Sequence, residues 1–136
     1  KLSDAGADRL VLADTIGAAN PRQVSSLMNR LTEKSDPQFL GCHFHDTRAM
    51  GLANVYAALE SGIRYFDTSI AGLGGCPFAP GSSGNVATED VVMMLDQMGY
   101  CTGINLSELL SASKFAAELT ASKSSGRAFT WLNSQR

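Results

Sequence analysis

The side chains best suited to chemistry are His43 and His45, which are the only histidines of the chain. They lie two residues apart near the end of the apolar run FLGCHFH, which predicts a β-strand. Residues two apart on a strand point to the same face, and two imidazoles on one face can bind the same divalent ion. Asp46 follows directly and adds a carboxylate. The spacing therefore indicates either a metal site at a strand end or a pair of hydrogen-bonded polar residues.

A segment rich in glycine and proline carries Cys76. Residues 72–81 read GLGGCPFAPG, so few large side chains surround the thiol. Long glycine-rich loops at the end of a sheet are often functional, and a thiol with a tuned pKa can donate or accept a proton. The alternative is a flexible linker with an incidental cysteine. The three cysteines, Cys42, Cys76 and Cys101, are widely spaced and form no C-x-x-C pair. The sequence therefore favours free thiols over disulfides or a structural zinc site.

Three other polar residues border predicted elements. Asn85 comes shortly before a predicted helix; its amide oxygen can bind a hard cation, although it can equally be a turn residue. Asp14 follows the apolar run DRLVLA and is either a supporting or catalytic carboxylate or a turn residue. Glu89 lies in the first turn of the predicted helix, where a carboxylate is favourable beside the positive helix end.

The elements that must position these residues alternate between strands and helices. The apolar runs predict strands and the periodic apolar residues predict helices, at 8–13 (strand), 21–35 (helix), 39–45 (strand), 49–61 (helix), 63–71 (strand), 89–98 (helix) and 106–122 (helix). This order is typical of an α/β protein with a parallel sheet, either open and doubly wound or part of a (β/α)8 barrel. No G-x-G-x-x-G follows the first strand, which weakens a dinucleotide-binding fold. In both architectures the carboxyl ends of the strands carry function, so the candidate residues are expected to lie together.

Local signals set the expected helix starts and the end of the folded unit. Three positions have residue types that are typical of helix starts: Asn20 followed by Pro21, then Thr88, and finally Asn105 with Glu108 three residues later. We expect residues 1–122 to form one partial barrel and residues 123–136 to form a polar, frayed tail in which Phe129 and Trp131 can dock.

The composition excludes several classes of function. The 136 residues carry a net charge of -2, with 44% hydrophobic and 18% charged residues, which suits one globular domain. This charge balance offers no basic face for nucleic acid or for an anionic membrane. No apolar stretch is long enough for a membrane span and no secretion signal begins the sequence, so we expect a protein that is not secreted.

Three stretches together resemble hydroxymethylglutaryl-CoA lyase: HFHDT at 43–47, SIAGLGGCPF at 69–78 and GNVATED at 84–90. The resemblance includes DTIG at 14–17 and extends to about Leu110. The GLGGCP stretch is its specific part. The H-x-H pattern and the later asparagine are shared with isopropylmalate and homocitrate synthases and related aldolases of the same metal-dependent barrel superfamily, which generally lack the cysteine loop.

This resemblance implies a (β/α)8 barrel whose last three strands are present. It implies cleavage of 3-hydroxy-3-methylglutaryl-CoA to acetyl-CoA and acetoacetate with Mg²⁺ or Mn²⁺. It also implies roles for individual residues: metal ligation by His43, His45 and Asn85, proton transfer by His43, catalysis by Cys76, and support of the site by the acidic Asp14 and Glu89.

The family's remaining metal ligand is an aspartate beside an arginine on the first strand, and both belong to an amino-terminal half that this sequence does not contain. We therefore expect the carboxyl-terminal half of a lyase, which alone binds metal weakly and turns over little substrate. Two alternatives stay open: another acyl-CoA or 2-oxoacid aldolase or synthase of the superfamily, such as an isopropylmalate synthase-like enzyme, or a non-catalytic metal-binding fragment that associates through its sheet edges. The resemblance implies a homodimer for the full-length protein, in the bacterial cytoplasm or the mitochondrial matrix.

Overall fold

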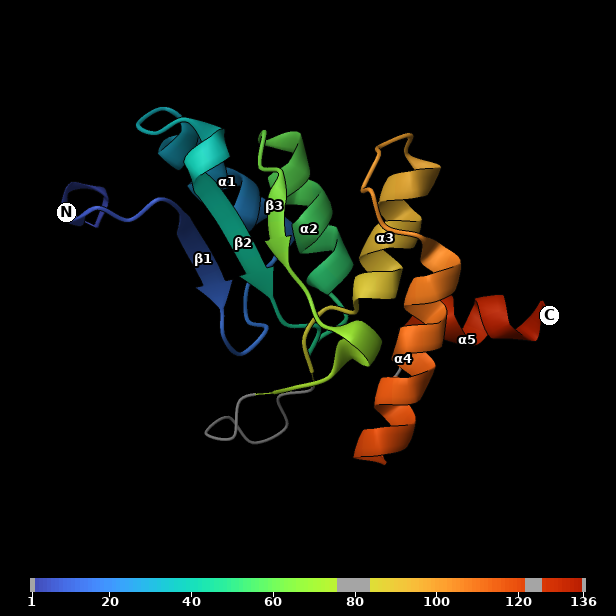
Figure 1. Ribbon diagram of the computed structural model, residues 1–136. Helices are drawn as coiled ribbons and strands as arrows, with labels where there is room; N and C mark the ends of the chain where they lie inside the picture. Colours follow the sequence, from blue (N-terminus) through green and yellow to red (C-terminus); the bar gives the residue numbers. More distant parts are fainter. Residues whose placement is uncertain (1, 76–83, 122–125, 136) are drawn as a thin grey trace.

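A parallel sheet organises the chain, which the computed structural model describes at residues 2–75, 84–121 and 126–135 (Figure 1). The sheet order is β1-β2-β3, with β1 at Leu10–Asp14, β2 at Leu40–Phe44 and β3 at Tyr65–Asp67. Both strand pairs are parallel, and the register places Leu12 opposite Cys42 and Cys42 opposite Phe66. The expected α/β class with a parallel sheet is thus confirmed.

Helices follow each strand. α1 (Pro21–Thr32) and α2 (Gly51–Glu60) connect the strands and lie side by side on one face of the sheet (Figure 1). α3 (Thr88–Gln97), α4 (Leu106–Thr120) and α5 (Arg127–Ser134) gather beyond β3. Three short 3-10 helices complete the described part of the chain: η1 (Ser3–Ala5), η2 (Pro37–Phe39) and η3 (Ile70–Gly72).

The start of α1 follows its local sequence. The Asn20 side chain accepts a hydrogen bond from the Gln23 amide at 3.0 Å, and the Gln23 side chain accepts one from the Asn20 amide at 3.1 Å. This reciprocal pair satisfies two amide groups that the first helical turn leaves without partners, and Pro21 needs none. The predicted start of α1 is confirmed. The Asn105 side chain also caps α4, as predicted, by accepting hydrogen bonds from the amides of Ser107 and Glu108.

The core lies between the sheet and the pair α1 and α2. Alternate residues of β2 point into it, since residues two apart share a face of a strand, and the side chains packed there include Met28, Leu40, Cys42, Phe44, Val55 and Ile63. The opposite face of β2 carries Gly41 and His43. Across this second face the register aligns His43 with Ala13 of β1 and Asp67 of β3. The histidine pair therefore belongs to the face turned away from α1 and α2.

The third strand is shorter than expected. It ends at Asp67 because the following residues pair with the start of α3: the Ser69 carbonyl accepts from the Thr88 amide at 3.0 Å, and the Thr68 and Thr88 hydroxyls lie 2.8 Å apart. Thr88 was expected to cap α3, and this expectation is wrong. Thr88 is the first residue of the helix, and its hydroxyl bonds Thr68 instead.

Residues Arg127–Ser134 form a helix rather than part of the expected frayed tail. The amides of Arg127 and Ala128, in the first turn of α5, donate to the two carboxylate oxygens of Asp90 at 3.0 and 2.6 Å. A carboxylate is favourable at this position because it accepts from free amides and faces the positive end of the helix. The sequence signal was missed because the capping residue lies 37 positions before the helix that it caps.

Cys42 and Cys101 are free thiols in very different surroundings. Cys42 has no exposed surface, its Sγ lies 3.7 Å from the Met28 Sδ, and burial raises its pKa to about 12 from an ordinary value of 9.0. Cys101 is exposed. Since burial holds the proton on Cys42, its contribution to stability is present below about pH 9 and is lost as the pH rises towards 12.

Alkylation should separate these two thiols. At about pH 8 the higher pKa leaves Cys42 with a thiolate fraction roughly 1000-fold smaller than that of an ordinary cysteine, before any steric protection is considered. We expect iodoacetamide to label Cys101 in the folded chain and to spare Cys42. Tandem mass spectrometry measures this, since it assigns the label within the tryptic peptide that Cys101 shares with Cys76. The same chain unfolded in guanidinium is the control, in which both peptides are labelled. Equal labelling rates in the folded chain would contradict the burial of Cys42.

None of the described helices has the length and apolar character that crossing a membrane requires.

Candidate functional site

The two histidines lie together at the carboxyl end of β2. Their ring centroids are 5.0 Å apart with an angle of 71° between the ring planes. His45 is only 7% exposed and His43 is half-buried. Both imidazoles can thus approach a single bound group while solvent is largely excluded from one of them.

A backbone carbonyl orients His45. The Nδ1 of His45 lies 3.0 Å from the carbonyl oxygen of Asp14, at the end of the neighbouring strand. A carbonyl oxygen only accepts, so in the neutral ring Nδ1 carries the hydrogen and Nε2 keeps its lone pair. Histidine ligands of metals commonly donate their other ring N–H to such an acceptor, which fixes the ring and raises its basicity.

Asn85 is brought to the histidines by backbone pairing. It forms an antiparallel bridge with His45, flanked by hydrogen bonds from the Asp46 amide to the Gly84 carbonyl (3.1 Å) and from the Val86 amide to the Phe44 carbonyl (3.0 Å). The structure thus unites three of the residues singled out in the sequence. The pairing holds their backbone positions independently of any bound ligand.

The amide group of Asn85 has one satisfied end and one unsatisfied end. Its Nδ2 donates to the Leu73 carbonyl at 2.8 Å, whereas its Oδ1 is buried and accepts no hydrogen bond from the described residues. Buried polar atoms without a partner are rare and call for an explanation, such as a missing ion. Asn54 on α2 has the only other such oxygen in the described structure. Asn85 differs from it in being paired with His45.

This donor set fits part of a divalent cation site. Two imidazole nitrogens and one amide oxygen suit Mn²⁺, and the oxygen also suits Mg²⁺. The described residues contain no group of three or more histidine, cysteine or acidic side chains that could hold a metal, because the third donor here is an amide. The candidate donors His43, His45 and Asn85 therefore make up an incomplete set, which needs at least one further donor to hold a metal.

Asp14 acts through two different groups. Its carboxylate accepts from the amides of Ala18 (2.8 Å) and Ala19 (3.0 Å) and so closes the turn after β1. Its backbone oxygen is the acceptor for His45. The same turn is held from outside by Arg48, whose guanidinium donates to the carbonyls of Gly17 and Ala18. The sequence reasoning did not single out Arg48, because its partners are backbone atoms that leave no sequence pattern.

Glu89 is completely buried and joins three parts of the chain. One carboxylate oxygen accepts from the Ala71 amide in η3 at 3.1 Å and from the Ser113 hydroxyl on α4 at 3.2 Å. The other accepts from the Gly126 amide before α5 at 3.2 Å. The residue pattern suggested only that Glu89 favours the start of a helix. In the structure its carboxylate also links η3, α4 and the residue before α5. Cys76, the remaining predicted site residue, lies outside the described residues.

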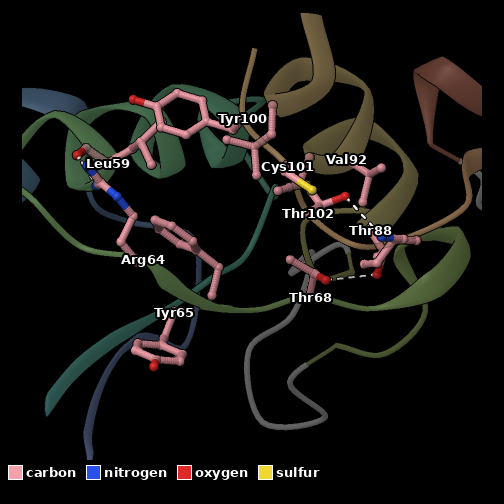
Figure 2. A pocket seen from close by; sticks show the side chains of 13 residues that line it. Leu59, Arg64, Tyr65, Thr68, Thr88, Val92, Tyr100, Cys101 and Thr102 are labelled. Atoms are coloured by element: carbon pink, nitrogen blue, oxygen red, sulfur yellow. Dashed lines mark hydrogen bonds between the residues drawn. The ribbon is translucent and has the colours of Figure 1, made fainter. Parts of the chain in front are cut away.

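A separate cavity of about 340 Å³ opens between β3, α3 and residues 100–104 (Figure 2). Its walls are largely apolar, and two of the residues that line it, Thr68 and Thr88, are hydrogen-bonded to each other. The guanidinium of Arg64 at its rim is already used by the carbonyls of Leu59 and Ile63, both at 2.8 Å. Among the described residues, none of the predicted site residues lines this cavity, and those predicted residues lie at the strand ends instead.

A parallel sheet with connecting helices, and with nitrogen and oxygen donors at the strand ends, defines the class: an α/β protein with a candidate divalent cation site. Residues 1–116 match the model of the HMGL-like family, and the chain belongs to this family.

Several relatives are lyases of acyl-CoA thioesters. The chain is 52% identical over 117 residues to the hydroxymethylglutaryl-CoA lyase of Bacillus subtilis, covering 86% of this chain and 39% of the relative. It is 46% identical over 110 residues to the (R)-citramalyl-CoA lyase of Chloroflexus aurantiacus, covering 81% of this chain and 35% of the relative. Mitochondrial hydroxymethylglutaryl-CoA lyases are also similar, including the human one. The chain spans about 40% of the length of the curated relatives that it matches.

Solved structures agree with these similarities. The crystal structure of the Bacillus subtilis HMG-CoA lyase superposes with a TM-score of 0.92 at 47% identity, over 97% of this chain and 44% of that one. An HMG-CoA lyase from Acinetobacter baumannii, solved in complex with coenzyme A and 3-methylmalate, superposes with a TM-score of 0.87 at 43% identity, over 92% of this chain and 41% of that one.

Proposed function

We propose that this chain forms the carboxyl-terminal part of a (β/α)8 barrel that cleaves 3-hydroxy-3-methylglutaryl-CoA to acetyl-CoA and acetoacetate. The observation that carries the proposal is the Oδ1 of Asn85, which is buried beside the pair His43 and His45 and accepts no hydrogen bond from the described residues. The similarity to hydroxymethylglutaryl-CoA lyases along most of the chain supports the choice of reaction. The placement of His43 on the sheet face turned away from α1 and α2 is in keeping with a barrel interior.

His43, His45 and Asn85 are proposed to hold Mg²⁺ or Mn²⁺. Such an ion, when bound, supplies stabilisation of the negative charge that develops on the substrate oxygens. The protein's own contribution is to present three donors in a fixed arrangement. The Asp14 carbonyl orients one imidazole and the Leu73 carbonyl orients the amide.

The reaction needs one proton removed and one proton added. An imidazole, proposed to be that of His43, accepts the proton of the substrate's tertiary hydroxyl, and that carbon–oxygen bond becomes the ketone of acetoacetate. The carbon–carbon bond breaks, and its electron pair passes to the thioester side as an enolate. The thiol of Cys76 is proposed to protonate the enolate carbon, which gives acetyl-CoA. Asp14 and Glu89 position the groups that meet the substrate.

The donor set described above is incomplete, and we propose that a longer barrel supplies the acidic ligand and the arginine that the family resemblance implies. Residues 1–122 belong to the barrel in this proposal. The complete protein is proposed to be a homodimer in the bacterial cytoplasm or the mitochondrial matrix, compartments that agree with the sources of the relatives.

A fusion tests this proposal. The amino-terminal portion of the Bacillus subtilis relative, which the chain does not cover, is joined ahead of the 136 residues. We expect the chain alone to release little or no acetoacetate from hydroxymethylglutaryl-CoA, and the fusion to release it only with Mg²⁺ or Mn²⁺ present. Rapid release by the chain alone would contradict the incomplete site. A folded fusion that shows no metal-dependent release would contradict the proposed reaction.

A second candidate substrate is (R)-citramalyl-CoA, because a lyase named for it is 46% identical to this chain. Offering both thioesters to the fusion and comparing kcat/KM distinguishes the two lyases. Cys76→Ala in the same fusion distinguishes either lyase from a synthase of the superfamily, since we expect only the lyase chemistry to collapse when the thiol is removed. An isolated chain that binds metal while the fusion turns over neither thioester would favour the non-catalytic alternative.

A further inference from the structure

The orientation of the Asn85 side-chain amide depends on the residue that follows η3. Its Nδ2 donates to the carbonyl of Leu73, the residue that directly follows η3. Gly74, with a φ of +97°, comes so close that a side chain there would meet the Asn85 Nδ2 at 2.8 Å. The orientation of the amide, and with it the direction of Oδ1, therefore depends on where η3 places the Leu73 carbonyl.

The position of η3 depends in turn on Glu89. Ala71 in the middle of η3 has a φ of +56°, a conformation that a residue with a side chain adopts only when its surroundings hold it there. Its amide donates to the buried carboxylate of Glu89 at 3.1 Å. This hydrogen bond is a direct restraint on the strained turn.

Ser113 holds the same carboxylate from α4. The hydroxyl has no exposed surface and donates at 3.2 Å to the oxygen of Glu89 that also accepts from Ala71. Gly126 fixes the other oxygen, and a side chain there would meet the Glu89 Cγ at 2.8 Å. A buried carboxylate needs such donors to stay in one orientation. The path from α4 to the candidate ligand is thus continuous through Ser113, Glu89, η3, Leu73 and Asn85.

We propose that Ser113 and Glu89 are positioning residues that orient the Asn85 amide so that its oxygen faces the cation. The proposal rests on the proposed function for the cation itself. Neither residue touches the substrate or the ion in it. Ser113 lies 28 positions after Asn85 in the sequence, outside the motifs that suggested the site.

The test uses the full 136-residue chain and two readouts, one of which needs no metal. We expect Ser113→Ala and Glu89→Gln to shift the side-chain amide signals of Asn85 in ¹H–¹⁵N spectra of the metal-free chain, because the hydrogen bond to Leu73 changes. The same variants are expected to weaken Mn²⁺ binding by about 10-fold, in the range found when a group supporting a metal ligand is removed. The matched control is Ser111→Ala on the same helix, since the Ser111 hydroxyl is exposed and donates to the Ser107 carbonyl within α4. It should change neither readout.

Unchanged Asn85 signals in folded Ser113→Ala and Glu89→Gln would overturn the proposal, as would an equal effect of Ser111→Ala. Loss of the folded spectrum in both variants would overturn it too, since the network would then only hold the fold. If neither the unmodified chain nor the fusion described above binds Mn²⁺, the proposed function fails, while the metal-free amide signals still decide whether Ser113 and Glu89 orient Asn85.

Discussion

Leucine in place of Asn85 is expected to abolish most Mn²⁺ binding while leaving the chain about as stable as before. The substitution removes a buried oxygen that has no partner among residues 2–75, 84–121 and 126–135, which relieves a desolvation cost. It also removes the hydrogen bond to Leu73. These opposing terms leave a net change in unfolding free energy within about 1 kcal/mol. Loss of one of the three proposed donors should lower Mn²⁺ affinity by about 100-fold or more. This is a larger decrease than the one expected when a residue that only supports a ligand is replaced. Electron paramagnetic resonance of free Mn²⁺ and urea unfolding measure the two effects separately.

Asn54→Leu is the matched control for this prediction. Asn54 shares the same pattern, with one N–H donated to the Ala19 carbonyl at 3.2 Å and a buried oxygen that has no partner in the part of the chain that the structure describes. It lies on α2 and forms no bridge with a histidine. Its replacement should leave Mn²⁺ affinity unchanged. Equal losses of affinity in both variants, or none in Asn85→Leu, would remove Asn85 from the ligand set.

The parts of this fold that were predictable are those determined by neighbours in sequence. Asn20 and Pro21 start α1, and Asn105 starts α4, through bonds that span no more than three residues. The apolar run before His43 predicted β2, and the spacing of two correctly placed both histidines on one face. That Asn85 would join them followed only from the rule that strand ends of a parallel sheet meet at one edge.

The unpredicted parts depend on contacts distant in sequence or on backbone atoms. The acceptor for His45 is the backbone oxygen of Asp14, which any residue type would offer, so no pattern reveals it. Thr88 is a residue type that often caps helices, yet its hydroxyl is hydrogen-bonded to that of Thr68, the residue directly after β3. The buried partners of Glu89 come from α4 and Gly126, whose positions only the tertiary structure sets.

Alanine in place of Gly84 is the second substitution with a large expected effect. A Cβ there would overlap the backbone carbonyl oxygen of Gly72 and come within 2.8 Å of that of Gly74. Backbone atoms cannot rotate away like a flexible side chain, so either η3 or the segment that bridges to His45 must move. We expect a loss of about 1–3 kcal/mol of unfolding free energy, as for other overpacked positions, together with a fall in Mn²⁺ affinity. Urea unfolding and Mn²⁺ titration of the purified chain check both.

Gly103→Ala is the control for the effect of Gly84→Ala. A Cβ at Gly103 meets nothing within 4 Å, although its φ of +73° makes alanine strained by about 1–2 kcal/mol. This variant should therefore lose stability and keep its Mn²⁺ affinity. If Gly84→Ala also keeps its affinity despite the lower stability, the close approach of η3 does not set the geometry of the site.

The capping of α5 by Asp90, together with the bond from Gly126 to Glu89, changes where the chain can be shortened without harm. A truncation after residue 121 keeps β1–β3 and α1–α4, and a secondary-structure map alone would suggest that it is innocuous. It would nevertheless remove three backbone donors from two adjacent carboxylates, one of them completely buried. The start of α5 thus supplies the hydrogen-bond donors that the two carboxylates in the first turn of α3 need. Purification tags or protease sites therefore belong beyond α5.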